Sequence, residues 1–178
     1  MNDTPYLLEG KDITHHDIYK TLEHNGYNLI SHVPLRKGRV ISIEELVTEI
    51  LAKSTQIREV EALPFVLTYA NFNPSILAEM AIYSSIEKKT GFICDLASAV
   101  QTLAGECRNR WELDTASHLL YPYRGNDEIS LINGIDESLK EKMKMHHELE
   151  GKWNIIGCLD IDDITKQMKR YMAFSDQA

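Results

Sequence analysis

The sequence has few cysteines, no long apolar run and no excess of positive charge. Its three cysteines, Cys94, Cys107 and Cys158, form no CxxC pair and leave one unmatched in any disulfide scheme, which favours a reducing compartment. No stretch approaches the roughly 18 to 20 apolar residues that a membrane span requires. The first residues also lack the basic and apolar segments of a secretory leader. The sequence therefore predicts a soluble, cytoplasmic protein without membrane contact.

Both halves of the chain carry a net negative charge. The net charge is −8, and acids outnumber bases both before and after Val60. A strong sequence-independent attraction for nucleic acid is therefore not expected. An acidic surface would instead complement a protein partner that carries basic groups.

Helix signals dominate the chain. Thr14 with Asp17, and Ser42 with Glu45, have the spacing of capping boxes, which predicts helices over about 15–25 and from 43 onward. Pro64 is expected to break or kink the helix that follows Ser54 and Thr55. Three further stretches predict buried helix faces: Ile43, Leu46, Val47, Ile50 and Leu51; Ile76, Leu77, Met80, Tyr83 and Ile86; and Phe92, Ile93, Leu96, Val100 and Leu103.

A short β-hairpin is expected near the N-terminus. Residues 27–33 alternate with period two, residues 39–43 are β-branched, and "PLRKG" lies between them. The predicted fold is a mainly α, compact domain of about six to seven helices with this single hairpin. Residues 1–178 form a single domain in this interpretation, with a helix–hairpin–helix unit over 1–54 packed on a helical body over 55–178. An extended piece near "EISLI", a helix over 112–120 and a helix over 136–149 ended by Gly151 complete the body.

The stretch "GCLDIDDITK" places Asp160, Asp162 and Asp163 after an apolar run. A phosphoryl-transfer site of the haloacid-dehalogenase type needs such a strand, but it also needs a whole α/β domain afterwards. Only 16 residues follow Asp162. The aspartates are therefore expected to cap the last helix, over about 163–173, where negative charge favours the helix N-terminus. The inner face of that helix would be Ile164, Met168, Tyr171 and Met172.

No catalytic residue, metal ligand or cofactor site is predicted. The adjacent pairs His15–His16 and His146–His147 point about 100° apart on a helix, unlike ligands spaced at i and i+4. Cys107 has cationic neighbours and His118 is the nearest base in sequence, but no nucleophile motif links them. A small metal-dependent or thiol hydrolase is therefore kept only as an alternative.

The segment 107–124 is the strongest candidate for a partner-binding surface. Tryptophan, tyrosine and arginine are over-represented at binding hot spots, and irregular segments often carry function. The candidate residues are Arg108, Arg110, Trp111, Tyr121, Tyr123 and Arg124. They predict a non-enzymatic protein that acts through protein–protein contacts, as an inhibitor, an immunity or antitoxin-type partner, or an accessory subunit.

A nucleic-acid-binding regulator is the second alternative. Arg36, Lys37 and Arg39 surround Gly38 at the expected hairpin tip, where they could contact a phosphate backbone. The next helix, "IEELVTEILAK", carries three glutamates and one lysine and would repel phosphate. A nucleic-acid partner is therefore not the favoured interpretation.

Overall fold

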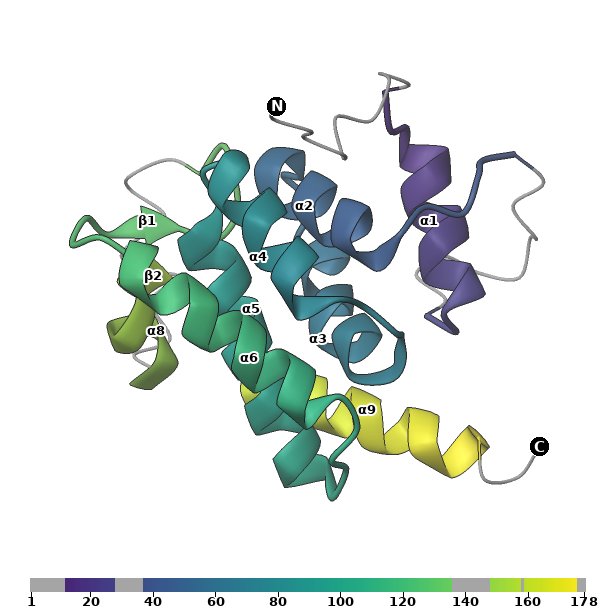
Figure 1. The fold of residues 1–178 in the computed structure, drawn as a ribbon. Coiled ribbons are helices and arrows are strands. Elements are labelled where there is room, and N and C mark those ends of the chain that lie inside the picture. The colour runs from purple at the N-terminus through teal and green to yellow at the C-terminus, as the bar shows by residue number, and fades with distance from the viewer. Residues whose placement is uncertain (1–11, 28–36, 136–147, 158, 176–178) are drawn as a thin grey trace.

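The computed structural model describes residues 12–27, 37–135, 148–157 and 159–175, and within them the chain is mainly helical (Figure 1). Two short strands, β1 (Ile129–Ser130) and β2 (Ile155–Ile156), pair in parallel, and η1 (Tyr121–Tyr123) is a 3₁₀ turn. The prediction of a mainly α fold is confirmed. The α-helices in these residues are α1 (His15–His24), α2 (Ile43–Lys53), α3 (Ile57–Tyr69), α4 (Pro74–Tyr83), α5 (Glu87–Ala104), α6 (Arg110–Leu120), α8 (Glu148–Trp153) and α9 (Ile161–Ser175).

The predicted helix starts are confirmed by their capping hydrogen bonds. Asp17 N donates to Thr14 Oγ1, and Thr14 N donates back to Asp17 Oδ2. Ser42 and Glu45 make the same reciprocal pair at the start of α2. These contacts satisfy backbone amides that have no partner within the helix, so each box fixes where its helix begins.

The acidic cluster before α9 begins that helix, as predicted. Asp160 Oδ1 accepts hydrogen bonds from the backbone N–H groups of Asp162 at 2.8 Å and Asp163 at 3.1 Å. Asp162 and Asp163 are exposed in the first turn, and Lys166 lies 3.0 Å from Asp163. The cap is thus Asp160, two residues earlier than the sequence signal suggested, and Ile164 and Met168 are buried as expected.

Pro64 was expected to break or kink its helix; α3 runs through it without interruption, so the break is wrong. The proline removes one backbone donor, which usually destabilises a helix interior. In α3 the segment Val60–Thr68 is almost wholly buried, and the Thr68 hydroxyl donates to the Pro64 carbonyl at 2.8 Å. Tertiary packing on most sides of α3 therefore outweighs the local cost.

Two expected core residues lie on the surface. Tyr83 at the end of α4 is 81% exposed, and Leu103 at the end of α5 is 55% exposed. Helix α4 instead buries its small residues, Ala78 and Ala81, together with Leu77. Apolar residues occur all around α4, so its periodicity alone does not select the buried face.

Helix α5 is the central element of the fold. It packs against α6, α3 and α9 along its length and also contacts α4 and α8. Buried apolar side chains from α1 through α9 form one cluster around it. Figure 1 places α1 on one side of the molecule and β1, β2 and α8 on the opposite side.

The N-terminal hairpin is not supported. Residues 28–36, which would hold its first strand and turn, lie outside the described residues, and residues 37–42 form no strand. Within that stretch the Arg39 amide donates to the Asp17 carboxylate and the Ile41 amide donates to the Thr21 hydroxyl. These backbone donors bind side chains of α1 rather than a neighbouring strand.

The C-terminal third agrees in part with the sequence. The extended piece near "EISLI" is confirmed as β1, and the helix expected over 112–120 is confirmed as α6. Most of the helix expected over 136–149 lies outside the described residues. Gly151 was expected to end it but lies inside α8, which ends before Asn154, a residue with positive φ.

Candidate interaction surface

Helix α6 and the η1 turn carry most of the proposed binding residues. Trp111 in the first turn of α6 is 70% exposed, and Tyr123 in η1 is 53% exposed. The other tryptophan, Trp153, is fully buried. Trp111 and Tyr123 are thus the most exposed aromatic side chains of the predicted set.

Arg108 and Arg110 lie at the N-terminal end of this surface and already contact neighbouring groups. The Arg108 guanidinium is 5.2 Å from the centre of the Tyr69 ring, and its Nε is 3.5 Å from Glu106. Arg110 Nε lies 3.9 Å from Asp114 on the next turn of α6. Both arginine side chains remain more than half exposed, so these weak contacts leave them accessible.

Tyr121 and Arg124 lie at the other end and pack inward. The Tyr121 ring meets the buried indole of Trp153 edge to face, with ring centres 5.8 Å apart. The Arg124 guanidinium lies 3.8 Å above the Tyr121 ring. This stack covers the junction between η1 and α8. The six predicted residues therefore divide into two groups at the ends of α6 instead of one continuous patch.

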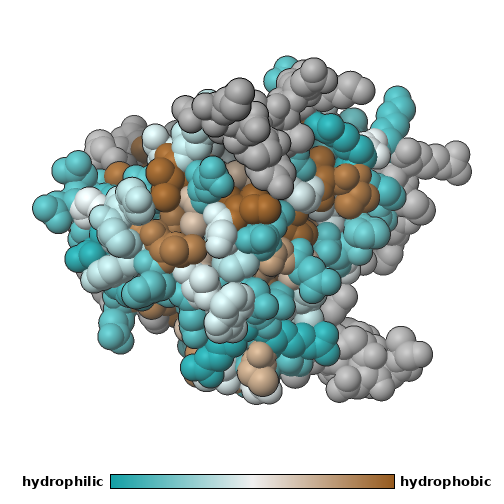
Figure 2. Space-filling model, in the orientation of Figure 1, coloured by the Kyte–Doolittle hydropathy of each residue, from teal (hydrophilic) through white to brown (hydrophobic). Residues whose placement is uncertain are grey.

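An open apolar groove of about 480 Å³ lies between α4 and the α6–η1 segment. We call it the α4–α6 groove. Figure 2 shows apolar side chains gathered on this face of the molecule among hydrophilic ones. Glu79 is the one ionisable acid among its described lining residues, which are Ser75, Ala78, Glu79, Ile82, Tyr83, Leu119 and Tyr123.

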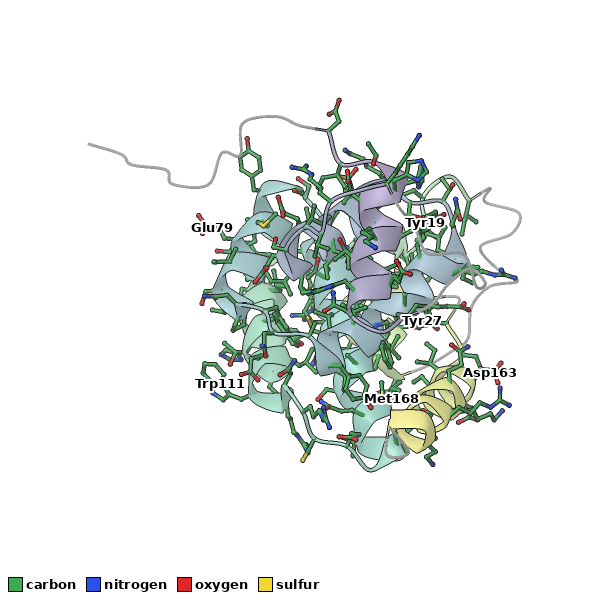
Figure 3. All side chains as sticks on the ribbon, turned by 90° about the vertical axis from the view of Figure 1, so that its right-hand side faces the viewer. Tyr19, Tyr27, Glu79, Trp111, Asp163 and Met168 are labelled. Atoms are coloured by element: carbon green, nitrogen blue, oxygen red, sulfur yellow. The ribbon has the colours of Figure 1, made fainter. Side chains whose placement is uncertain are left out.

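Only Tyr123 of the groove was predicted from sequence. Ile82 and Leu119 are exposed by about two fifths, and both resemble core positions in an apolar helix. One signal was present: Tyr83 ends α4 directly before two serines, and helix ends lie at the surface more often than helix centres. Figure 3 shows Glu79 and Trp111 projecting from the same side of the molecule, so α4 and α6 together form one exposed face.

The remaining sequence candidates do not form a chemical centre in the described residues. His15 and His16 are exposed in the first turn of α1. No group of three histidine, cysteine, aspartate or glutamate side chains in the described segments has the arrangement of a metal site. Cys107 is exposed and Cys94 is buried, and burial raises the pKa of the Cys94 thiol well above its usual value. His146, His147 and Cys158 lie outside the described residues.

Two of the three basic residues of the expected hairpin tip lie in the part of the chain that the structure describes. Arg36 lies outside the described residues, whereas Lys37 and Arg39 are exposed. Arg39 contacts Asp17 twice, through its backbone N–H at 2.7 Å and through Nε at 3.9 Å. Hydrogen bonds from the amides of Arg39 and Thr14 lower the pKa of the Asp17 carboxyl. Arg39 thus takes part in holding α1.

Comparison of the chain with protein-family models, curated proteins and solved structures gives no match. The described helices include none that is long and apolar enough to cross a membrane. The class of protein is therefore defined by its own features: a helical domain with an exposed aromatic and apolar face on α4, α6 and η1.

Proposed function

We propose that this protein acts through protein–protein contacts and that its docking surface is the α4–α6 groove, extended along α6 to Trp111. The occupant we propose is an amphipathic helix of a partner protein, with apolar anchors on one face and a lysine or arginine beside them. The observation that carries the proposal is the exposure of Tyr83 and Tyr123 in one apolar groove, with Trp111 exposed at the other end of α6.

The shape and lining of the groove favour a helix as occupant. A groove between two helices accepts the ridge of a third, with anchor side chains at i, i+3 and i+7. The small side chain of Ala78 leaves space on the α4 side of the groove, while Ile82 on α4 and Leu119 on α6 provide apolar contacts. Aromatic anchors that become fully buried in such grooves are typical hot spots.

The charge of the face favours a basic group in the partner. Glu79 lines the groove and is exposed, and the whole chain carries a net charge of −8. A lysine or arginine beside the apolar anchors would lie close to Glu79. Long-range attraction would speed encounter, and burial of the aromatic rings would slow dissociation. The protein would act by covering the partner's helix, consistent with an inhibitor, an antitoxin-type partner or an accessory subunit.

The proposal is tested by affinity capture with the full chain, followed by titration of the captured protein after purification. The expected result is a complex of fixed stoichiometry whose affinity falls at least about 10-fold in Tyr83→Ala and in Trp111→Ala, the range of interface hot spots. Glu79→Gln is expected to lower the association rate and reduce its dependence on salt.

Leu103→Ala supplies the matched control. Leu103 is an exposed apolar side chain at the end of α5 and does not line the groove. Its truncation should leave the affinity unchanged. The proposal is wrong if Leu103→Ala weakens the complex as much as Tyr83→Ala does, or if no complex of fixed stoichiometry forms.

A further inference from the structure

A second cavity lies away from the α4–α6 groove, between the start of α1, the end of α2 and the beginning of α3. Its volume is about 400 Å³, within the range of small-molecule sites. Figure 3 faces the α1 side of the molecule, where Tyr19 is labelled. The lining is mostly polar and consists of Asp12, Ile13, His15, Ile18, Glu49, Lys53, Ser54, Thr55, Gln56 and Glu59.

Glu59 is the unusual member of this lining because its side chain is only 1% exposed and half of its carboxylate lacks a donor. Oε2 accepts a hydrogen bond from the Ser54 hydroxyl at 2.5 Å. Oε1 is buried and makes no hydrogen bond, and His15 Nδ1 lies 3.5 Å from it. A buried acceptor without a donor costs about 1–3 kcal/mol, and more when it is charged.

The position of Glu59 in α3 accounts for only part of this arrangement. Glu59 is in the first turn of the helix, where a negative charge is favourable. The Ser54 hydroxyl both donates to Glu59 and accepts from the Gln56 amide, so Oε2 is already part of a local helix-start network. None of these contacts uses Oε1. Oε1 makes no hydrogen bond, although His15 Nδ1 lies 3.5 Å from it, so it can accept one from a bound ligand.

The charges around the cavity favour a positively charged donor. Asp12, Glu49 and Glu59 are acidic, and Lys53 is the only lysine or arginine among the described lining residues. Lys53 Nζ lies 2.8 Å from Glu49, so this pair neutralises itself. Asp12 and Glu59 then leave an excess of negative charge. A metal ion fits poorly, because no cluster of three suitable ligands occurs in the described segments.

The geometry of the carboxylate selects the kind of cation. A guanidinium group binds best with two parallel hydrogen bonds to both oxygens of one carboxylate. Oε2 of Glu59 already accepts a hydrogen bond from Ser54, and Oε1 is the oxygen without one. A primary ammonium group is a compact charge and can bind Oε1 through one N–H without disturbing the Ser54 contact to Oε2. We therefore take an ammonium group as the better fit.

We propose that this cavity is a binding site for a small organic molecule with a primary ammonium group, which donates a hydrogen bond to Oε1 of Glu59. The ring of His15, whose side chain is 68% exposed, covers that oxygen and turns outward to admit the ligand. The Tyr19 hydroxyl donates to Oε1 of Gln56, a lining residue, at 3.5 Å. This site is independent of the docking surface on α4 and α6.

The test is an NMR titration of the ¹⁵N-labelled full chain with butylammonium chloride, with 1-butanol as the uncharged probe of similar shape. Saturable shifts are expected for the amides of Thr55, Gln56 and Glu59 with butylammonium, with at least a 10-fold weaker response to 1-butanol. Equal responses to the two probes would overturn the proposal, as would shifts that do not saturate.

Three variants locate the binding group. Glu59→Gln is expected to weaken butylammonium binding at least 10-fold, whereas Glu79→Gln, which removes the same charge on α4, should leave it unchanged. His15→Ala removes the covering ring and is expected to strengthen binding several-fold. Unchanged binding in Glu59→Gln, or weaker binding in His15→Ala, would overturn the proposal. The probe comparison and His15→Ala leave Glu59 in place, so they test the idea even if Glu59→Gln is destabilised.

Discussion

The indole ring of Trp153 lies directly against Gly91 of α5, where a side chain of any size would collide with it. One turn further along α5, Asp95 Oδ2 accepts a hydrogen bond from Trp153 Nε1 at 2.6 Å. Asp95 Oδ1 also accepts from the Ser117 hydroxyl of α6 at 2.6 Å. Gly91 leaves room for the Trp153 ring and Asp95 accepts its hydrogen bond, so these two residues of α5 hold α8 in place. The Asp95 carboxylate also links α6 to α5.

Gly91→Ala is therefore expected to destabilise the protein, because the added methyl group overlaps the Trp153 ring. Overpacking of this kind typically costs about 1–3 kcal/mol, to be measured as the free energy of unfolding in urea. Gly151→Ala is the matched control, since nothing lies within 4 Å of a Cβ at that helical position. It should be neutral or stabilising by up to about 1 kcal/mol. Equal effects of the two changes would contradict the packing described.

Truncation of the two tryptophans should have very different effects on the free energy of unfolding. Trp153→Ala empties a fully buried site and should cost about 3–5 kcal/mol of unfolding free energy. Trp111→Ala removes a side chain that is 70% exposed and should change that free energy by no more than about 0.5 kcal/mol. Chemical denaturation of both variants gives the comparison. A large loss of stability in Trp111→Ala would place that ring in the core and remove it from the docking surface.

Acid should weaken the contact between Asp17 and the chain that follows α1. The Arg39 amide, and then the Thr14 amide, lower the pKa of Asp17 below its ordinary value of 3.8. The folded state therefore holds this carboxyl deprotonated more strongly than the unfolded state does. The contribution of Asp17 to the free energy of unfolding is complete above about pH 4 and is lost as the pH falls through the lowered pKa.

The check is the difference in unfolding free energy between the native protein and Asp17→Asn, followed from pH 6 to pH 2. This difference is expected to shrink on acidification. Asp127→Asn, at an exposed position, should give a smaller and flatter difference. If the Asp17→Asn difference stayed constant through the acid range, the carboxylate would not supply the stabilisation described.

Alkaline pH should stabilise the fold through Lys89. Its ammonium group is buried and donates to Asn133 Oδ1 at 2.6 Å and to the Leu51 carbonyl at 3.3 Å. Burial lowers the pKa of Lys89 from 10.5 to about 8. Between these two values the unfolded chain binds more protons than the folded one, so the free energy of unfolding rises with pH.

The contribution of Lys89 is isolated by comparison with Lys89→Met between pH 7.5 and pH 10.5. The difference in unfolding free energy between the native protein and the variant should rise by up to about 1.4 kcal/mol per pH unit between the two pKa values. Lys169→Met, at an exposed position of α9, should show no comparable slope. A flat difference for Lys89→Met would mean that Lys89 titrates at its ordinary value when folded.

Local signals were enough to predict how several helices begin. Thr14 with Asp17 and Ser42 with Glu45 act within a few residues, so their function depends little on the rest of the chain. The stripe of α2 was also sufficient, because its five apolar positions face one side and all are buried. The three aspartates before α9 were recognised as a helix start for the same reason.

The surface could not be predicted in the same way. Helix α4 is apolar on nearly every side, so its buried face depends on which neighbours accept Ala78 and Ala81 rather than on its own pattern. That choice leaves Ile82 and Tyr83 exposed beside Leu119, which lies 36 residues after Tyr83 in the chain. The α4–α6 groove therefore exists only after the helices have packed.

The mainly helical character of the chain and the starts of several helices follow from the sequence alone, because hydrogen bonds and side-chain spacing within one or two turns fix these features. Tertiary structure alone decided which tryptophan is core and which is surface: Trp153 is buried because Gly91, far away in sequence, leaves room for its ring. It likewise placed His15, Ser54 and Glu59 from separate segments around one cavity. Such relationships depend on contacts across the whole chain, and no local pattern encodes them.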